Sequence, residues 1–209
     1  MMVCSLACVS THAQQSSPAP ANRSESIHQI FVEDQEDIPG AANGISKLSP
    51  EEYEARLQAR KAKVHAMLAA GELKTGQDFE DASFIFQHED NTADSLMAHV
   101  LAMEAVIRGD DRAKWIAAAT LDRYLQSVHQ PQVFGTQYPL DPNLPHTVAS
   151  GNARFLTGRT LQPYNEQFLP DPIRFDFCVP SLDQQRKNVA MFNAGQRPFA
   201  TMRAPGCRH

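Results

Sequence analysis

The sequence contains no run of the ~18–20 consecutive apolar residues that a membrane-spanning helix requires. It also has no block of lysine and arginine, and its net charge is -5, so the basic surface by which proteins attract nucleic acid is missing. We therefore expect neither a membrane span nor nucleic acid as a partner. The modest acidic balance mainly favours solubility.

Cysteine is scarce, and the motifs of several enzyme classes are missing. The four cysteines form no Cys-x-x-Cys pair and no cluster with histidine, so a structural zinc site is not expected. The helical stretches carry no Glu-x-x-His pair, which a carboxylate-bridged metal site in a helical bundle would use. A Gly-x-Ser-x-Gly elbow, a phosphate-binding P-loop and a dinucleotide glycine fingerprint are all absent. We therefore expect neither a metal nor an organic cofactor.

The N-terminus has features of an export signal. Met1 to Ser10 is a short apolar run, and residues 11–13 (Thr-His-Ala) resemble the small-residue end before a cleavage site. The basic start of such a signal is missing, which leaves open a start site upstream of Met1 or a cytoplasmic N-terminal tail. We interpret residues 1–13 as a signal peptide and expect a periplasmic or secreted protein.

Removal of that signal would leave two cysteines, Cys178 and Cys207. In an oxidising compartment these could form a disulfide that holds a proline-rich C-terminal tail. The alternative is two unrelated thiols, one buried and one near the chain end. The sequence does not distinguish the two.

Helical signals begin only after a long irregular stretch. Residues 14–47 are rich in Ser, Pro, Ala, Asn and Gly without periodicity and are predicted to be a linker. Ser49 can then cap a helix, with Pro50 at its first position and Glu52 completing a capping box. That helix should end near residue 70, at a glycine. Three more helices are predicted further along, over residues 78–90, 92–108 and 111–128.

Apolar side chains indicate how these helices pack. In the helix over 92–108 the large apolar residues form one stripe, which is expected to face the core. The stripe consists of Leu96, Val100, Met103 and Ile107. Helices joined by connections this short usually pack as antiparallel neighbours.

Prolines recur so often after residue 130 that long helices are excluded there. Only residues 181–193 are predicted to be helical again. We therefore predict a mainly α fold, in which a small helical bundle carries a proline-rich, largely irregular C-terminal region. The helical domain is expected over residues 48–195, followed by a tail over 196–209.

Two polar residues lie on helix faces that are otherwise apolar. His88 shares a face with the phenylalanine and the isoleucine one turn before it, and Asp122 interrupts the stripe of its own helix. A buried carboxylate needs a partner, and His88, Arg123 or a backbone donor could supply one. A His–Asp pair would orient the imidazole as a general base. The alternative is a core histidine and a structural ion pair.

A loop with uncharged polar side chains follows the helix of Asp122. Gly135 permits a tight backbone turn there, and its neighbours offer hydrogen-bond donors and acceptors. Such a loop could line a pocket or simply close the helix ends. The residues predicted to bind a substrate are Arg123, Gln132, Thr136 and Gln137.

Three short segments resemble a bacterial domain family of unknown function. They are Gln87-His88, Leu121-Asp122-Arg123 and residues 132–137 (Gln-Val-Phe-Gly-Thr-Gln), which match a pattern of QH, a helix pair, DR and Q-x-(Y/F)-G-T-Q. The resemblance covers about residues 50–195, with Phe134 in place of the usual tyrosine. It implies no particular activity, but it selects the same residues as the helical pattern.

Two functional hypotheses follow. The first is a hydrolase or lyase acting on a small exported or envelope substrate, with His88 as general base and Asp122 orienting it, while Arg123 and Gln137 hold an anionic or amide group. The second is a non-enzymatic binding or interaction module, whose polar cluster is structural and whose partner is a small molecule or an envelope protein. The sequence leaves both open.

Overall fold

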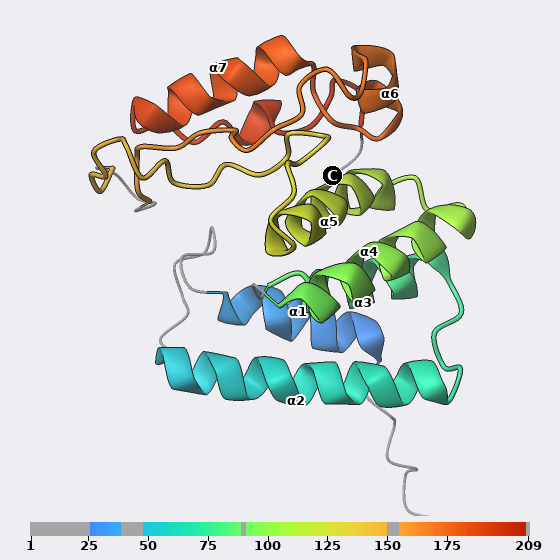
Figure 1. The fold of residues 1–209 in the computed structure, drawn as a ribbon. Coiled ribbons are helices and arrows are strands. Elements are labelled where there is room, and N and C mark those ends of the chain that lie inside the picture. Colours follow the sequence, from blue (N-terminus) through green and yellow to red (C-terminus); the bar gives the residue numbers. More distant parts are fainter. Residues whose placement is uncertain (1–25, 39–47, 89–90, 150–154, 208–209) are drawn as a thin grey trace, which may run out of the picture.

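The computed structural model describes residues 26–38, 48–88, 91–149 and 155–207 (Figure 1). Within these residues the chain forms α-helices, one short 3-10 helix and no β-strand, which confirms the prediction of a mainly α fold. The helices are α1 (Ile27–Asp37), α2 (Pro50–Ala69), α3 (Gly76–Phe86), α4 (Thr92–Ile107), α5 (Ala113–Ser127), α6 (Asp171–Asp176) and α7 (Leu182–Asn193), and the 3-10 helix is η1 (Phe199–Thr201). No helix of this described part is long and apolar enough to cross a membrane.

Side-chain caps fix where the bundle helices begin. At α2 the hydroxyl of Ser49 accepts the N–H of Glu52, and the Glu52 carboxylate accepts the N–H of Ser49, so the predicted capping box is confirmed. Thr75 and Asp78 form a second capping box at α3. Asn91 caps α4 by accepting two backbone N–H groups of its first turn.

Helix α1 lies inside residues 14–47, which the sequence predicted to be a linker. Its Ile27 and Ile30 are buried in the same core as the apolar residues of α2 and α3. The linker prediction is therefore wrong for α1. The helix carries several charged residues and buries only a narrow apolar face, which explains why its periodicity was inconspicuous. The predicted signal peptide, residues 1–13, lies outside the described residues.

Helix α4 packs between α3 and α5 through its small residues. Close packing of helices favours small side chains at the contact, because these bring the helix axes together. The buried residues of α4 are Ser95, Ala98, Leu101, Ala102 and Ala105. By contrast, Leu96, Val100 and Ile107 keep exposed fractions of 41%, 54% and 74%. The predicted core stripe is therefore wrong for these three residues, and only Met103 packs against the core.

The proline-rich C-terminal region covers the side of α5 that faces away from α2 (Figure 1). Between α5 and α6 the described residues form isolated β-bridges, such as that between Gln132 and Tyr164, and no β-strand. Helix α7 matches the predicted helix over residues 181–193, and α6 was not predicted. A second small core joins this region to α5 through Ala118, Phe134 and Val179.

Candidate ligand-binding pocket

His88 pairs with α1 and not with Asp122. Its Nε2 lies 2.9 Å from Oδ2 of Asp34, which is completely buried, and Arg60 of α2 lies 3.7 Å from the other carboxylate oxygen. Among the described residues no hydrogen bond or ion pair joins His88 to Asp122. The predicted His–Asp catalytic pair is therefore not formed. The Asp34–Arg60–His88 cluster instead ties α1 to α2 and to the end of α3.

Asp122 is completely buried in α5 and holds the loop that follows this helix. Its Oδ1 accepts the N–H groups of Val133 (2.8 Å) and Phe134 (3.0 Å). Its Oδ2 accepts the N–H (2.9 Å) and the hydroxyl (2.7 Å) of Thr136. Burial raises the pKa of Asp122, and these four donors act in the opposite direction. Both oxygens are occupied by the loop, so Asp122 is a structural residue of the site.

Gln132 is also buried, and its side-chain amide joins the two ends of the same loop by bonding to the backbone of Gln137. Its Nε2 donates to the carbonyls of Gln137 (3.0 Å) and Leu161, while its Oε1 accepts the N–H of Gln137 (3.0 Å). The side chain has no exposed surface. The prediction that Gln132 contacts a substrate is therefore wrong, because its polar atoms are used within the fold.

The carbonyl of Phe134 joins the loop to the C-terminal helices. It accepts hydrogen bonds from Arg174 Nη1 (2.6 Å), Gln185 Nε2 (2.6 Å) and the Tyr164 hydroxyl (3.3 Å). Arg174 and Gln185 are completely buried. Gly135 follows with a φ of +77°, a backbone conformation that glycine adopts without steric cost. The loop is thus fixed by α5 on one side and by α6 and α7 on the other.

The outer side of this loop forms one wall of a pocket of about 510 Å³. Arg123, Thr136 and Gln137 all line it, so three of the four residues predicted to bind a substrate meet at one cavity. The Gln137 side chain is held in place by donating to the carbonyl of Ala119 (3.2 Å) and to the Thr136 hydroxyl (3.0 Å). The remaining lining residues are Trp115, Gln126, Tyr138, Pro139, Phe155, Arg159, Phe192, Arg197 and Met202.

The pocket is cationic and aromatic. Three arginines and four aromatic rings line it, and the described lining includes no Asp, Glu, His or Cys. Burial lowers the pKa of Arg159, and the nearby charge of Arg197 lowers it further. The Tyr138 phenol is protonated at neutral pH and can donate a hydrogen bond, and burial raises its pKa further. These features favour a ligand with an anionic group and an apolar part.

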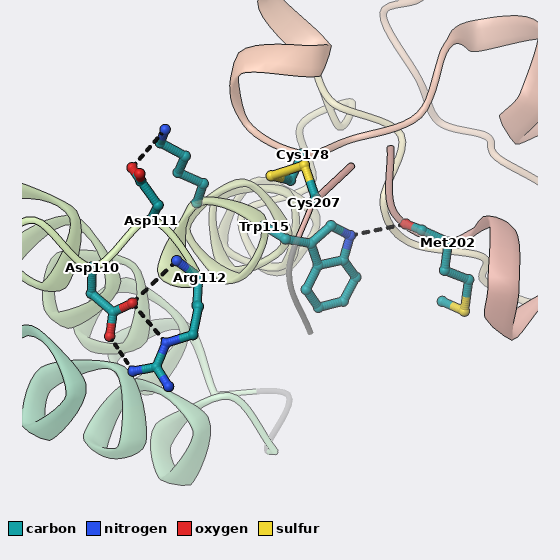
Figure 2. Close-up of a disulfide and its surroundings, with 8 residues drawn as sticks. Asp110, Asp111, Arg112, Trp115, Cys178, Met202 and Cys207 are labelled. Carbon is teal, nitrogen blue, oxygen red and sulfur yellow. Dashed lines mark hydrogen bonds and ion pairs between the residues drawn. A yellow bond between two sulfur atoms is a disulfide. The ribbon is translucent and has the colours of Figure 1, made fainter. Parts of the chain in front are cut away.

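A larger cavity of about 740 Å³ lies beside the disulfide, and it is the weaker candidate. Four of the five charged side chains in its lining pair with one another: Arg112 contacts Asp110 at 2.6 Å and Lys114 contacts Asp111 at 2.7 Å (Figure 2). Charged side chains that are already paired attract a charged ligand less strongly than a pocket lined by charges of a single sign.

A disulfide joins Cys178 and Cys207, the two cysteines whose pairing the sequence left open (Figure 2). Near it the Trp115 indole donates to the carbonyl of Met202 (3.1 Å), and the N–H of Ala204 donates to the carbonyl of Cys178 (2.8 Å). The C-terminal segment is thus held against α5. Because Trp115 and Met202 line the pocket, the disulfide supports one of the pocket walls.

Replacing Cys207 by serine is expected to lower the free energy of unfolding by about 2 kcal/mol, because the cross-link restricts the unfolded chain over a separation of 29 residues. Denaturant unfolding of the oxidised protein and the variant would measure this loss. Reducing agent should destabilise the parent by a similar amount and leave the variant unchanged. Equal stability of parent and variant under oxidising conditions would contradict the expectation.

Glu80 of α3 is a buried carboxylate near this segment, 3.4 Å from Arg112. Burial raises its pKa to about 6, the charge of Asp110 adds to the rise, and Arg112 opposes it. The folded state therefore holds a proton that the unfolded state loses above its ordinary value of 4.5, so the stability due to this group falls as pH rises from 4.5 to about 6.

Replacing Glu80 by glutamine should remove this pH dependence. The melting temperature of the parent should fall relative to that of Glu80→Gln as pH rises through the window, and the difference should be constant above it. The exposed Glu72→Gln variant is the control, and it should follow the parent. Parallel melting curves for Glu80→Gln and the parent at every pH would show that Glu80 titrates normally.

Nine of the lining residues were not predicted to bind a substrate. Four of these nine form arginine–aromatic contacts: Phe155, Arg159, Phe192 and Arg197. They come from the irregular region and from the end of α7, where periodicity carries no information about the site. One signal was present. Arg159 follows Phe155 by four positions, and Arg197 follows Phe192 by five. In the structure each arginine lies over the ring of the other pair.

The described residues contain no group of three or more His, Cys, Asp or Glu side chains arranged to hold a metal ion. Comparison of the chain with protein-family models, with curated proteins and with solved structures finds no significant match.

Proposed function

We propose that this chain is a non-enzymatic binding protein that takes a small organic anion into the pocket between α5, the 132–137 loop and the end of α7. The observation that carries the proposal is the lining: three arginines and four aromatic rings, with no acidic side chain among the described lining residues. The volume of about 510 Å³ lies within the range typical of small-molecule sites.

The lining divides into a polar and an apolar part. Arginine guanidinium groups bind carboxylates and phosphates through paired N–H donors, and Thr136 and Gln137 add uncharged hydrogen-bonding groups. Trp115 and Tyr138 offer flat apolar surfaces with one polar atom each. An anion attached to a ring would use both parts at once.

Two observations favour binding over the hydrolase or lyase hypothesis. The His88 imidazole pairs with Asp34, and the Asp122 carboxylate is occupied by the loop, so the general base and its orienting group are not brought together. The pocket itself offers arginines and amides, which bind and orient but do not exchange protons near neutral pH.

We also propose that the chain works in an oxidising compartment, in the periplasm or outside the cell. The Cys178–Cys207 disulfide supports this, because such bonds are rare in the reducing cytosol.

The only tryptophan of the chain, Trp115, lines the pocket and can report on binding. Titration with benzoate or phenyl phosphate should change the Trp115 fluorescence saturably, with a dissociation constant on the order of 0.1–1 mM. Benzylamine, which carries the same ring on a cation, should have no such effect. Arg123→Gln should weaken binding of the anions, whereas Arg186→Gln, at an exposed arginine paired with Glu166 on another surface, should not.

Equal binding of benzylamine and the anions, or no saturation by any of these anions up to about 10 mM, would overturn the proposal.

A further inference from the structure

We infer that the pocket selects a phosphate monoester of an aromatic group over a singly charged anion of the same shape, with Arg159 and Arg197 as the residues that set this preference. The inference deepens the proposed function and rests on it.

Arg159 is held in the pocket wall by neutral acceptors. Its Nη1 donates to the carbonyl of Tyr138 (2.6 Å) and its Nε to the carbonyl of Leu156 (3.1 Å). No carboxylate of the described residues forms an ion pair with it. These bonds fix the position of the guanidinium without neutralising its charge.

An aromatic pair positions the two arginines beside each other. The rings of Phe155 and Phe192 pack edge to face with centroids 5.7 Å apart. The Arg159 guanidinium lies over Phe192 at 5.4 Å and the Arg197 guanidinium over Phe155 at 5.1 Å. The two guanidinium groups therefore lie on the same pair of packed rings. Burial lowers the pKa of Arg159, and the charge of Arg197 lowers it further, as expected for neighbouring cations.

Two neighbouring guanidinium groups repel each other, and an anion with two charges offsets this repulsion better than an anion with one. A phosphate monoester carries close to two negative charges above its second pKa of ~6 and offers three acceptor oxygens. A sulfonate has the same tetrahedral shape and three oxygens but only one charge. The dianion gains attraction to both guanidinium groups, so the difference in affinity between these ligands reflects mainly their charge.

The aromatic ring of the ligand would pack against the aromatic side chains of the pocket wall. Trp115 and Tyr138 line the same cavity and present aromatic surface to it. Inorganic phosphate lacks this contact. An aryl phosphate is therefore the class that fits, and inorganic phosphate should bind more weakly.

The experiment is calorimetric titration of the oxidised full-length protein at pH 8 with phenyl phosphate, benzenesulfonate and inorganic phosphate. Phenyl phosphate should bind about tenfold more tightly than benzenesulfonate, and more tightly than inorganic phosphate. In Arg197→Gln the preference over benzenesulfonate should fall close to one. Arg186→Gln changes the net charge equally, away from the pocket, and should keep the preference.

Each outcome bears on one of the two proposals. If phenyl phosphate and benzenesulfonate bind with equal affinity to the parent, the dianion preference is overturned and anion binding stands. If inorganic phosphate matches phenyl phosphate, the assignment to aromatic esters is overturned. If none of the three binds, the proposed function itself fails. Because the ligand comparison uses the parent protein, an unfolded variant would leave this test intact.

Discussion

Replacing Asp122 by alanine is expected to lower the free energy of unfolding by about 4 kcal/mol, because four donors would lose their buried acceptor at once. Three of these donors are backbone N–H groups of the loop, and the fourth is the Thr136 hydroxyl. The loop also carries the Phe134 carbonyl on which Arg174 and Gln185 converge, so its loss should loosen the packing of α6 and α7 on α5.

Denaturant unfolding of Asp122→Ala measures this effect, and two variants serve as controls. Asp122→Asn keeps the shape and one acceptor oxygen and should lose about half as much stability. Asp111→Ala removes an exposed carboxylate at the start of α5 and should stay within about 0.5 kcal/mol of the parent. A fully stable Asp122→Ala protein would show that Asp122 is not a structural residue and would reopen a role in chemistry.

Replacing Gly135 by alanine is expected to cost about 3 kcal/mol. A Cβ at this position would lie 2.5 Å from Oε1 of Gln185 and 2.8 Å from the ring of Tyr164. Both side chains are held by hydrogen bonds to the neighbouring Phe134 carbonyl, so neither can move away without breaking one. The positive φ adds strain for any residue with a side chain.

Gly109 supplies a matched control for this substitution. Its φ is +86°, but a Cβ there would meet nothing within 4 Å. Gly109→Ala should therefore cost only the backbone strain, about 1 kcal/mol. Thermal or denaturant unfolding compares the two variants. Equal losses at Gly109 and Gly135 would contradict the close packing around the loop.

Local signals in the sequence predicted the helix starts well. Ser49 with Glu52 forms a complete capping unit in the chain itself, so no tertiary information is needed to locate the start of α2. Helix α1 was missed because its stability comes from packing: two isoleucines and the Asp34–Arg60–His88 cluster attach it to a surface that the sequence alone does not show.

The exposed apolar stripe of α4 shows that the spacing of apolar residues does not always predict which face of a helix is buried. Leu96, Val100 and Ile107 have ideal helical spacing, yet the opposite face of the same helix is rich in alanine and serine. Two neighbouring helices pack against that small-residue face, and the larger residues are left outside. Apolar spacing identifies a helix, whereas the face that is buried depends on which neighbours approach it.

The sequence predicted the part of the candidate site whose residues lie close together along the chain. Asp122, Thr136 and Gln137 are close along the chain, so their cluster could be predicted. The partner of His88 is in α1, far along the chain, and pairing it with Asp122 was wrong. Arg159 and Arg197 lie on the same pair of rings because the end of α7 packs on the irregular region, and the spacing of residues along the chain does not encode that packing.

An aromatic anion is expected to bind in the pocket beside Trp115. The indole N–H of this single tryptophan gives one isolated signal in a proton–nitrogen NMR spectrum, and its position depends on the hydrogen bond to Met202 in the pocket wall. We predict that phenyl phosphate shifts this signal saturably in the parent protein and far less in Arg197→Gln. An indole signal that stays fixed throughout the titration of the parent would contradict the claim.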